Sequence, residues 1–325
     1  LLVAGCGQAE RGGVTEEEIE YETQDHLSFY GTLRLPTRDK PVPLLLVYHA
    51  ATGGRSDFAF YDHLKTDLPK AGVATFIFDR RGTGDQPGDF NSATFEELAR
   101  DGLAALSVLK ADPRIDATRI GTWGISQGGW IAPLAATLSN DVSFVISVSG
   151  PGVTPAQQMA FAAEYSLRGA GFSEETILQA SALRARIDAY YRNSSERDAL
   201  QADIASVENE PWYAFAYLPT ADELPEDPAQ TKWRVEMDYD PAKTLTKLDA
   251  PMLVMFGRKE RWVPVEQSTD RIRAAVSDQN LLTIYISENS GHFMSGGAET
   301  EEYMGDGPVE AEYLEFMLQW IAARE

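Results

Sequence analysis

The sequence predicts an α/β fold: a mostly parallel sheet of eight strands with helices on both sides and a helical cap inserted late in the chain. Two observations support this prediction. Continuous apolar runs, typical of strands buried on both faces, alternate with helical stretches, which is the pattern of a parallel sheet. A long segment without any such run then separates the last two strands from the rest. The six buried runs are 43–50, 73–79, 119–125, 142–150, 251–257 and 281–287.

The remaining two predicted strands precede the buried ones. Residues 17–23 and 27–36 alternate apolar and polar side chains, as a half-exposed antiparallel pair does. We therefore expect them at an edge of the sheet. A helix is predicted over 91–111, where Thr94 and Glu97 have the spacing of a capping box.

The inserted segment spans residues 151–245. Thr154 and Gln157, with Pro155 between them, predict a helix start, and Ser173 predicts another. We interpret 151–245 as a helical cap, 17–150 with 246–325 as the catalytic sheet domain, and 1–16 as a tether. The aromatic residues of 211–217 are expected to pack inside the cap rather than line a site.

Charge restricts the classes of partner. The chain carries 28 Lys and Arg against 50 Asp and Glu, a formal net charge of −22. Such a charge repels phosphate backbones and anionic lipid headgroups, so a nucleic-acid partner is not expected. A small neutral or cationic substrate fits better. No apolar run approaches the roughly 18 residues of a membrane span.

The N-terminal stretch LLVAGC contains the only cysteine, Cys6. It resembles a bacterial lipobox, in which a thiol after small residues carries the lipid. On this interpretation the protein is anchored in the bacterial cell envelope through Cys6, and contacts the membrane only through that anchor. The alternative is an ordinary cysteine in a terminal tail. One cysteine cannot form an intrachain disulfide.

The candidate nucleophile is Ser126, in the sequence Gly124-Ile-Ser-Gln-Gly128. This G-x-S-x-G pattern lies where a buried strand is predicted to turn into a helix, which is its catalytic context. Glycines on both sides relieve the crowding of a sharp turn. The amide of Gln127 would then face the reacting oxygen. The alternative is a small residue in a tight turn.

A serine hydroxyl needs a general base, and His292 is the candidate. It follows the last predicted strand, at the sheet edge where open α/β sheets place their sites. It is also the only histidine after Ser126, as the chain order serine, acid, histidine requires. The earlier histidines are His26, His49 and His63.

The candidate acid is Glu260, in the loop after the strand 251–257. A carboxylate there could accept the second imidazole N–H, fix its tautomer and stabilise the imidazolium. Asp240 and Asp270 are weaker candidates. The alternative for Glu260 is a surface residue paired with a neighbouring cation, Arg258, Lys259 or Arg261.

Together these residues resemble the α/β-hydrolases over residues 17–323, and within them the dienelactone-hydrolase and serine-aminopeptidase-like esterases. The matching motifs are YHAATGG, FDRRGTGDQPG, GISQGG, GRKERWVP and SGH. Two features depart from the family: its usual acid is Asp rather than Glu260, and its oxyanion loop usually begins His-Gly. The resemblance implies that the Ala51 amide is the second oxyanion donor beside Gln127, that His49 is structural, and that the DRRGTGD turn shapes the loop beside the site.

The predicted function is hydrolysis of carboxylic esters through an acyl-enzyme, with Ser126, His292 and Glu260 as the triad. The same triad could cleave peptides or thioesters. Cleavage from a peptide N-terminus would need acidic cap residues to hold the amine, which 221–228 could supply. A surface lipoprotein that binds without chemistry is a third alternative. No metal or organic cofactor is implied, because no His, Cys and Asp cluster has ligand spacing.

Overall fold

The computed structural model describes residues 13–52, 54–296 and 307–324. Its centre is an eight-stranded sheet in the order β1-β2-β4-β3-β5-β6-β7-β8. All pairs from β4 to β8 are parallel, whereas β1 and β2 are antiparallel to each other and β2 is antiparallel to β4. The predicted fold class is therefore confirmed. The strands are β1 (Val14–Glu22), β2 (Ser28–Pro36), β3 (Val42–Tyr48), β4 (Ala74–Phe78), β5 (Ile115–Ile125), β6 (Phe144–Val148), β7 (Met252–Gly257) and β8 (Leu282–Ser287).

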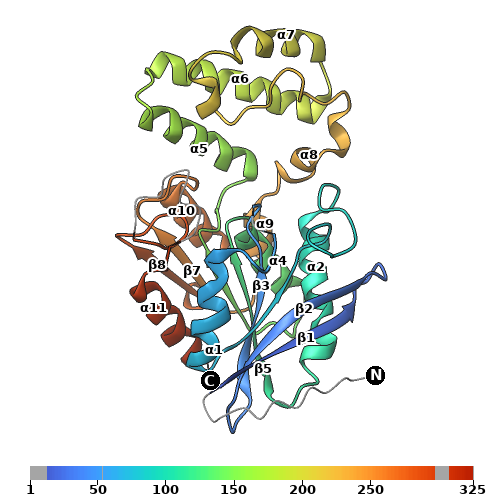
Figure 1. Ribbon diagram of the computed structural model, residues 1–325. Coiled ribbons are helices and arrows are strands. Elements are labelled where there is room, and N and C mark those ends of the chain that lie inside the picture. Colours follow the sequence, from blue (N-terminus) through green and yellow to red (C-terminus); the bar gives the residue numbers. More distant parts are fainter. Residues whose placement is uncertain (1–12, 53, 297–306, 325) are drawn as a thin grey trace.

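Helices cover both faces of the sheet (Figure 1). In β3, Leu44 and Leu46 point into one hydrophobic core while Leu45 and Val47 point into the other, because side chains alternate along a strand. The first core includes residues of α2, α4 and α10, and the second includes residues of η1, η2, α1 and α11. The bounds of these elements, and of the shorter elements α3, α9 and η5, are η1 (Ala59–Tyr61), η2 (His63–Asp67), α1 (Leu68–Ala71), α2 (Phe95–Ala104), α3 (Leu106–Leu109), α4 (Gln127–Leu138), α9 (Pro241–Leu245), α10 (Val265–Ala275), η5 (Gln279–Leu281) and α11 (Ala311–Ala322).

The expectation that residues 281–287 are buried on both faces is wrong. Leu282–Ile286 of β8 are only partly buried, because β8 is the last strand of the sheet and pairs with β7 alone. Helix α11 covers one face of this strand, where the rings of Tyr285 and Phe316 stack with centroids 4.6 Å apart. A continuous apolar run thus predicts a strand but does not show whether that strand pairs with other strands on one side or on both.

Between β6 and β7 the chain leaves the sheet and forms helices that lie over the carboxyl ends of the strands (Figure 1). Both predicted capping boxes are formed, at Thr94 for α2 and at Thr154 for α5. The inserted helices enclose a core of their own, in which Trp212 and Tyr213 are buried. The inserted elements are α5 (Pro155–Gly169), α6 (Glu174–Asn193), α7 (Arg197–Val207), η3 (Tyr213–Phe215), η4 (Pro228–Gln230) and α8 (Lys232–Glu236).

Two points bear on the relation to membranes. Within the described ranges, no helix combines the length and the apolar character that a bilayer crossing requires. Cys6, the expected lipidation site, lies outside the described residues.

Candidate active site

Ser126 occupies a strained turn between β5 and α4. Its backbone has φ 54° and ψ −115°, a conformation that a non-glycine residue adopts only when its surroundings impose it. The Ser126 amide donates to the carbonyl of Val148 at 2.9 Å, which ties the turn to the end of β6. The turn therefore presents Ser126 at the carboxyl edge of the sheet.

The two glycines of the motif are required by close backbone contacts. A Cβ on Gly124 would lie 1.9 Å from the carbonyl oxygen of Gly128, and a Cβ on Gly128 would lie 2.3 Å from that of Tyr48. Neither backbone atom can move aside as a flexible side chain could. The G-x-S-x-G pattern is thus explained by the geometry of the turn.

His292 and Glu260 form a buried pair beside this turn. Glu260 follows β7 and His292 follows β8, and the His292 Nδ1 atom lies 2.9 and 2.8 Å from the two carboxylate oxygens. Glu260 also accepts the backbone N–H of Trp262 at 2.9 Å. Because Nδ1 donates to the carboxylate, Nε2 is the imidazole atom that can accept a proton.

The other candidate acids are placed elsewhere. Asp240 caps the first turn of α9 and pairs with Arg271 at 2.9 Å. Asp270 is an exposed residue of α10, 3.8 Å from Arg273. Arg258 pairs with Glu288 and Glu266 rather than with Glu260. The structure therefore brings only Glu260, of these three acids, to His292.

The loop after β3 lies on the other side of Ser126, and both Ala50 and Ala51 line the same cavity as the serine. The Ala50 amide donates to the hydroxyl of Tyr61 at 3.3 Å, so Ala51 is the better candidate for an oxyanion donor. Gln127, the other candidate, begins α4, where backbone amides are free of intrahelical partners.

His49 is a packing residue of this loop. Its ring nitrogens bond to the Phe78 carbonyl and, at 3.1 Å, to the Tyr61 hydroxyl. Arg80, from the DRRGTGD turn, donates to the carbonyls of Ala50 and Ala51 at 3.0 and 3.1 Å. This turn therefore holds the loop in place, as the resemblance implied.

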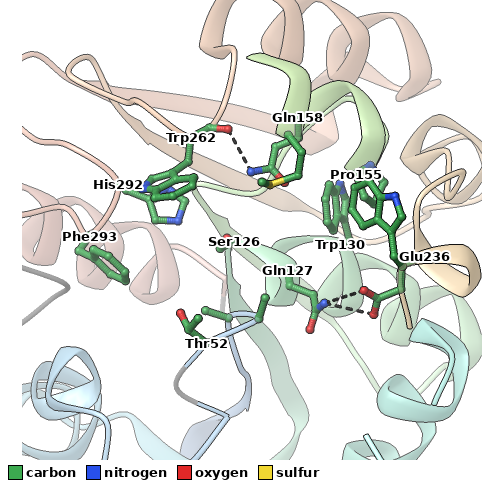
Figure 2. A pocket seen from close by; sticks show the side chains of 14 residues that line it. Thr52, Ser126, Gln127, Trp130, Pro155, Gln158, Glu236, Trp262, His292 and Phe293 are labelled. Atoms are coloured by element: carbon green, nitrogen blue, oxygen red, sulfur yellow. Dashed lines mark hydrogen bonds between the residues drawn. The ribbon is translucent and has the colours of Figure 1, made fainter. Parts of the chain in front are cut away.

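A cavity of about 310 Å³ opens between this edge of the sheet and the inserted helices. Figure 2 shows Ser126 and His292 on its wall, with aromatic side chains around them. Such a mostly apolar cavity with a few polar groups is typical of small-molecule sites. Its lining residues are Ala50, Ala51, Thr52, Ser126, Gln127, Trp130, Pro155, Gln158, Met159, Trp233, Glu236, Trp262, His292 and Phe293.

Most of these lining residues could not be assigned to a site from the sequence. Trp130, Trp233 and Trp262 come from three distant segments, and only tertiary packing brings them together. Trp130 and Trp262 had a local signal, since they stand four residues after the expected nucleophile and two residues after the expected acid. The acidic stretch 221–228 does not contribute to the lining.

Glu236, on α8, is a buried carboxylate on the cavity wall that the sequence analysis did not identify. It accepts both Gln127 Nε2–H bonds, at 3.1 and 3.2 Å, and pairs with Lys232 at 2.6 Å. Burial raises the pKa of Glu236, although Lys232 and Arg80 oppose the shift. Burial also lowers the pKa of Arg80, to about 10.

The part of the chain that the structure describes contains no cluster of side chains suited to binding a metal. No group of three or more His, Cys, Asp or Glu side chains there could hold a metal ion.

Comparison with known proteins identifies the family. The sequence model of the family described as serine aminopeptidase, S33, matches residues 41–292. An uncharacterized 31.7 kDa protein of Escherichia coli is 23% identical over 265 residues, 81% of this chain and 87% of that protein. A thiohydrolase of Aspergillus aculeatus is 29% identical over 135 residues, which is 41% of each chain.

Solved structures share the fold. The α/β hydrolase GrgF from Penicillium has a TM-score of 0.61 at 16% identity, over 95% of this chain and 99% of that one. An esterase of Pyrococcus furiosus has a TM-score of 0.57 at 14% identity, over 98% of this chain and 96% of that one. At these identities the likeness is one of fold.

Proposed function

Because the chain belongs to the serine aminopeptidase, S33, family of α/β hydrolases, we propose that it is a serine hydrolase that cleaves carboxylic esters through an acyl-enzyme. The observation that carries the proposal is the hydrogen bond between Glu260 and His292, because His292 lines the same cavity as the strained Ser126. Nucleophilic catalysis needs a nucleophile, a general base and an acid that orients the base, and Ser126, His292 and Glu260 are the candidates for these roles.

In the first half-reaction, His292 Nε2 takes the proton of the Ser126 hydroxyl as its oxygen attacks the ester carbonyl carbon. Glu260 keeps Nδ1 protonated and stabilises the imidazolium. The amides of Gln127 and Ala51 stabilise the negative oxygen, and each such donor contributes a factor of roughly 10²–10³ to turnover. The alkoxide then leaves with the proton from His292.

In the second half-reaction, His292 takes a proton from water as the water oxygen attacks the acyl carbon. The bond to Ser126 breaks, its oxygen regains a proton from His292, and the acid leaves. Each half-reaction returns the triad to its starting protonation state, so water is the only reactant needed besides the ester.

The cavity favours a neutral substrate with apolar groups. Three tryptophans and Phe293 line it. Burying the apolar surface of a substrate against these rings stabilises the complex by about 25 cal/mol per Å². Glu236 is the only carboxylate among its lining residues, and its oxygens are already engaged by Lys232 and Gln127. A peptide α-amine would have to share Glu236 with these partners, which disfavours aminopeptidase activity.

Thioester hydrolysis is the second candidate. It is supported by the partial matches to two fungal thiohydrolases, each over 41% of this chain. The same triad and oxyanion donors serve both reactions. Comparing p-nitrophenyl esters, N-acetylcysteamine thioesters and aminoacyl p-nitroanilides of matched acyl size would rank the three activities; the proposal requires the esters to have the highest kcat/KM.

The nucleophile is tested with a fluorophosphonate probe, which needs an activated hydroxyl beside an oxyanion hole. Mass mapping should place a single adduct on Ser126. Ser126→Ala should lose both labelling and ester turnover, whereas Ser107→Ala, which replaces an exposed serine of α3 that is not among the cavity-lining residues, should lose neither. Full turnover by folded Ser126→Ala protein would refute the proposal, and so would a wild-type protein with neither labelling nor turnover.

A further inference from the structure

A chain of hydrogen bonds connects the inserted helices to both sides of the candidate oxyanion hole. Glu236 of α8 accepts from the Gln127 side chain at 3.1 and 3.2 Å, as Figure 2 shows. Gln127 Oε1 in turn lies 3.4 Å from Arg80 Nη1. Arg80 then donates to the carbonyls of Ala50 and Ala51 at 3.0 and 3.1 Å.

The chain passes through Gln127 and ends at Ala50 and Ala51, so it includes Gln127 and Ala51, the two residues whose amides are proposed to bind the oxyanion. A peptide group is planar and trans, so its C=O and N–H point in opposite directions. When Arg80 holds the Ala50 carbonyl, it therefore also fixes the direction of the Ala51 N–H. The Gln127 side chain, held by Glu236, restrains the first residue of α4 in the same way.

The network is largely buried and contains two cations, Arg80 and Lys232, and one anion, Glu236. Arg80, Gln127 and Glu236 are 8, 5 and 7% exposed. Lys232 pairs with Glu236 at 2.6 Å and donates to the Ala93 carbonyl at 2.6 Å. The ring of Phe90 lies beneath both cations, 3.4 Å from Arg80 and 4.1 Å from Lys232. Away from water such bonds are strong, and removing one member leaves its partners unsatisfied.

We propose that Glu236 is a positioning residue for the oxyanion hole: the hole takes its working geometry only when α8 is docked and Glu236 holds Gln127. This inference rests on the proposed function, and it assigns the inserted helices a part in the chemistry beyond enclosing the substrate. Glu236 does not contact the reacting atoms on this account. Its effect is transmitted through the Gln127 side chain and Arg80.

The variants are Glu236→Ala, Glu236→Gln, Gln127→Ala and the double alanine variant, assayed with one p-nitrophenyl ester. Losing an oxyanion donor lowers kcat by a factor of roughly 10²–10³. A donor that is only displaced, as in Glu236→Ala, should therefore lower kcat by about 10–100-fold, with KM changed less than about threefold. Glu236→Gln keeps an oxygen for Gln127 Nε2 and should recover most of kcat. The double variant should be no slower than the slower single variant, because the two residues act through one path.

A second readout separates positioning from general damage. A trifluoromethyl ketone forms a tetrahedral adduct whose oxygen occupies the hole, so its inhibition constant should rise by the same factor as kcat/KM falls. Asp238→Asn is the matched control: this carboxylate lies two residues further along, pairs with Arg192 at 2.7 Å and is not among the cavity-lining residues. It should behave as the wild type.

The outcomes distinguish the two proposals. Glu236→Ala with wild-type kcat, or with a raised KM alone, would refute the positioning role while the wild type remained an esterase. Additive losses in the double variant, or no recovery in folded Glu236→Gln, would refute it as well. If the wild type and Asp238→Asn both lacked ester turnover, the proposed function would fail, and this inference with it.

Discussion

The Nδ1 atom of His292 lies within 2.9 Å of both carboxylate oxygens of Glu260, across 32 residues of sequence. The carboxylate also accepts a hydrogen bond from the backbone N–H of Trp262 at 2.9 Å. Esterases that the chain resembles usually have an aspartate at this position, and a glutamate is one methylene longer. It nevertheless reaches the imidazole with both oxygens, so the longer side chain is accommodated by this loop.

This pair predicts a large effect of Glu260→Gln. The amide cannot stabilise the imidazolium and can favour the wrong tautomer, and the corresponding change in a serine protease triad costs on the order of 10⁴ in kcat. Asp240→Asn, which loses only an ion pair with Arg271, should change kcat by less than about threefold. Steady-state kinetics on p-nitrophenyl esters measure both; the reverse order would show that Glu260 is not the acid.

The turn at Ser126 predicts that Gly124→Ala is disruptive. Its Cβ would lie 1.9 Å from a backbone oxygen, and overpacking of this kind costs about 1–3 kcal/mol or more. Both the thermal midpoint and fluorophosphonate labelling of Ser126 should fall. Gly169→Ala is the matched control, because a Cβ there meets nothing within 4 Å. Equal behaviour of the two variants would contradict the close-contact explanation.

A cavity of about 270 Å³ adjoins the catalytic one, and Trp262 lines both. Trp262→Ala should join them and shift the preferred acyl chain to longer esters, because more apolar surface can then be buried. The backbone N–H that bonds Glu260 is retained in this variant. The check is kcat/KM across p-nitrophenyl esters from acetate to decanoate, and an unchanged profile would place the acyl chain elsewhere.

His63 predicts a pH-dependent stability that is independent of catalysis. Its ring lies between the Phe60 carbonyl at 2.7 Å and the Tyr313 hydroxyl at 3.2 Å, and burial lowers its pKa from 6.5 to about 4. Between these values the unfolded chain binds a proton that the folded protein does not. Stability contributed by His63 is therefore complete above pH 6.5 and falls by up to about 3 kcal/mol as the pH drops to 4.

Urea unfolding at several pH values measures this effect. His63→Gln should be less stable at pH 7 but should show a shallower loss between pH 6.5 and 4. The exposed His26, replaced by Gln, should leave the slope unchanged. If His63→Gln retained the wild-type slope, the acid lability would have to arise at other groups.

The sequence by itself determined the α/β fold class and the candidates for the reacting residues. Buried strands and capped helices are coded by local patterns, since apolar runs and capping residues act over a few neighbours. The G-x-S-x-G turn is equally local, because its glycines relieve contacts within one turn or with the adjacent strand. Chain order was then enough to select His292, and the loop after β7 favoured Glu260 over Asp240 and Asp270 as the acid.

Tertiary structure alone decided how many neighbours each strand has and what surrounds Ser126. The sequence pattern of β8 is that of a central strand, yet the strand is at the sheet edge. Tryptophans from distant segments line the cavity. The hydrogen bonds from Glu236 through Gln127 to Arg80 likewise join residues that lie 156 positions apart in the sequence. No local pattern marks these contacts, because they arise only when the inserted helices dock on the sheet.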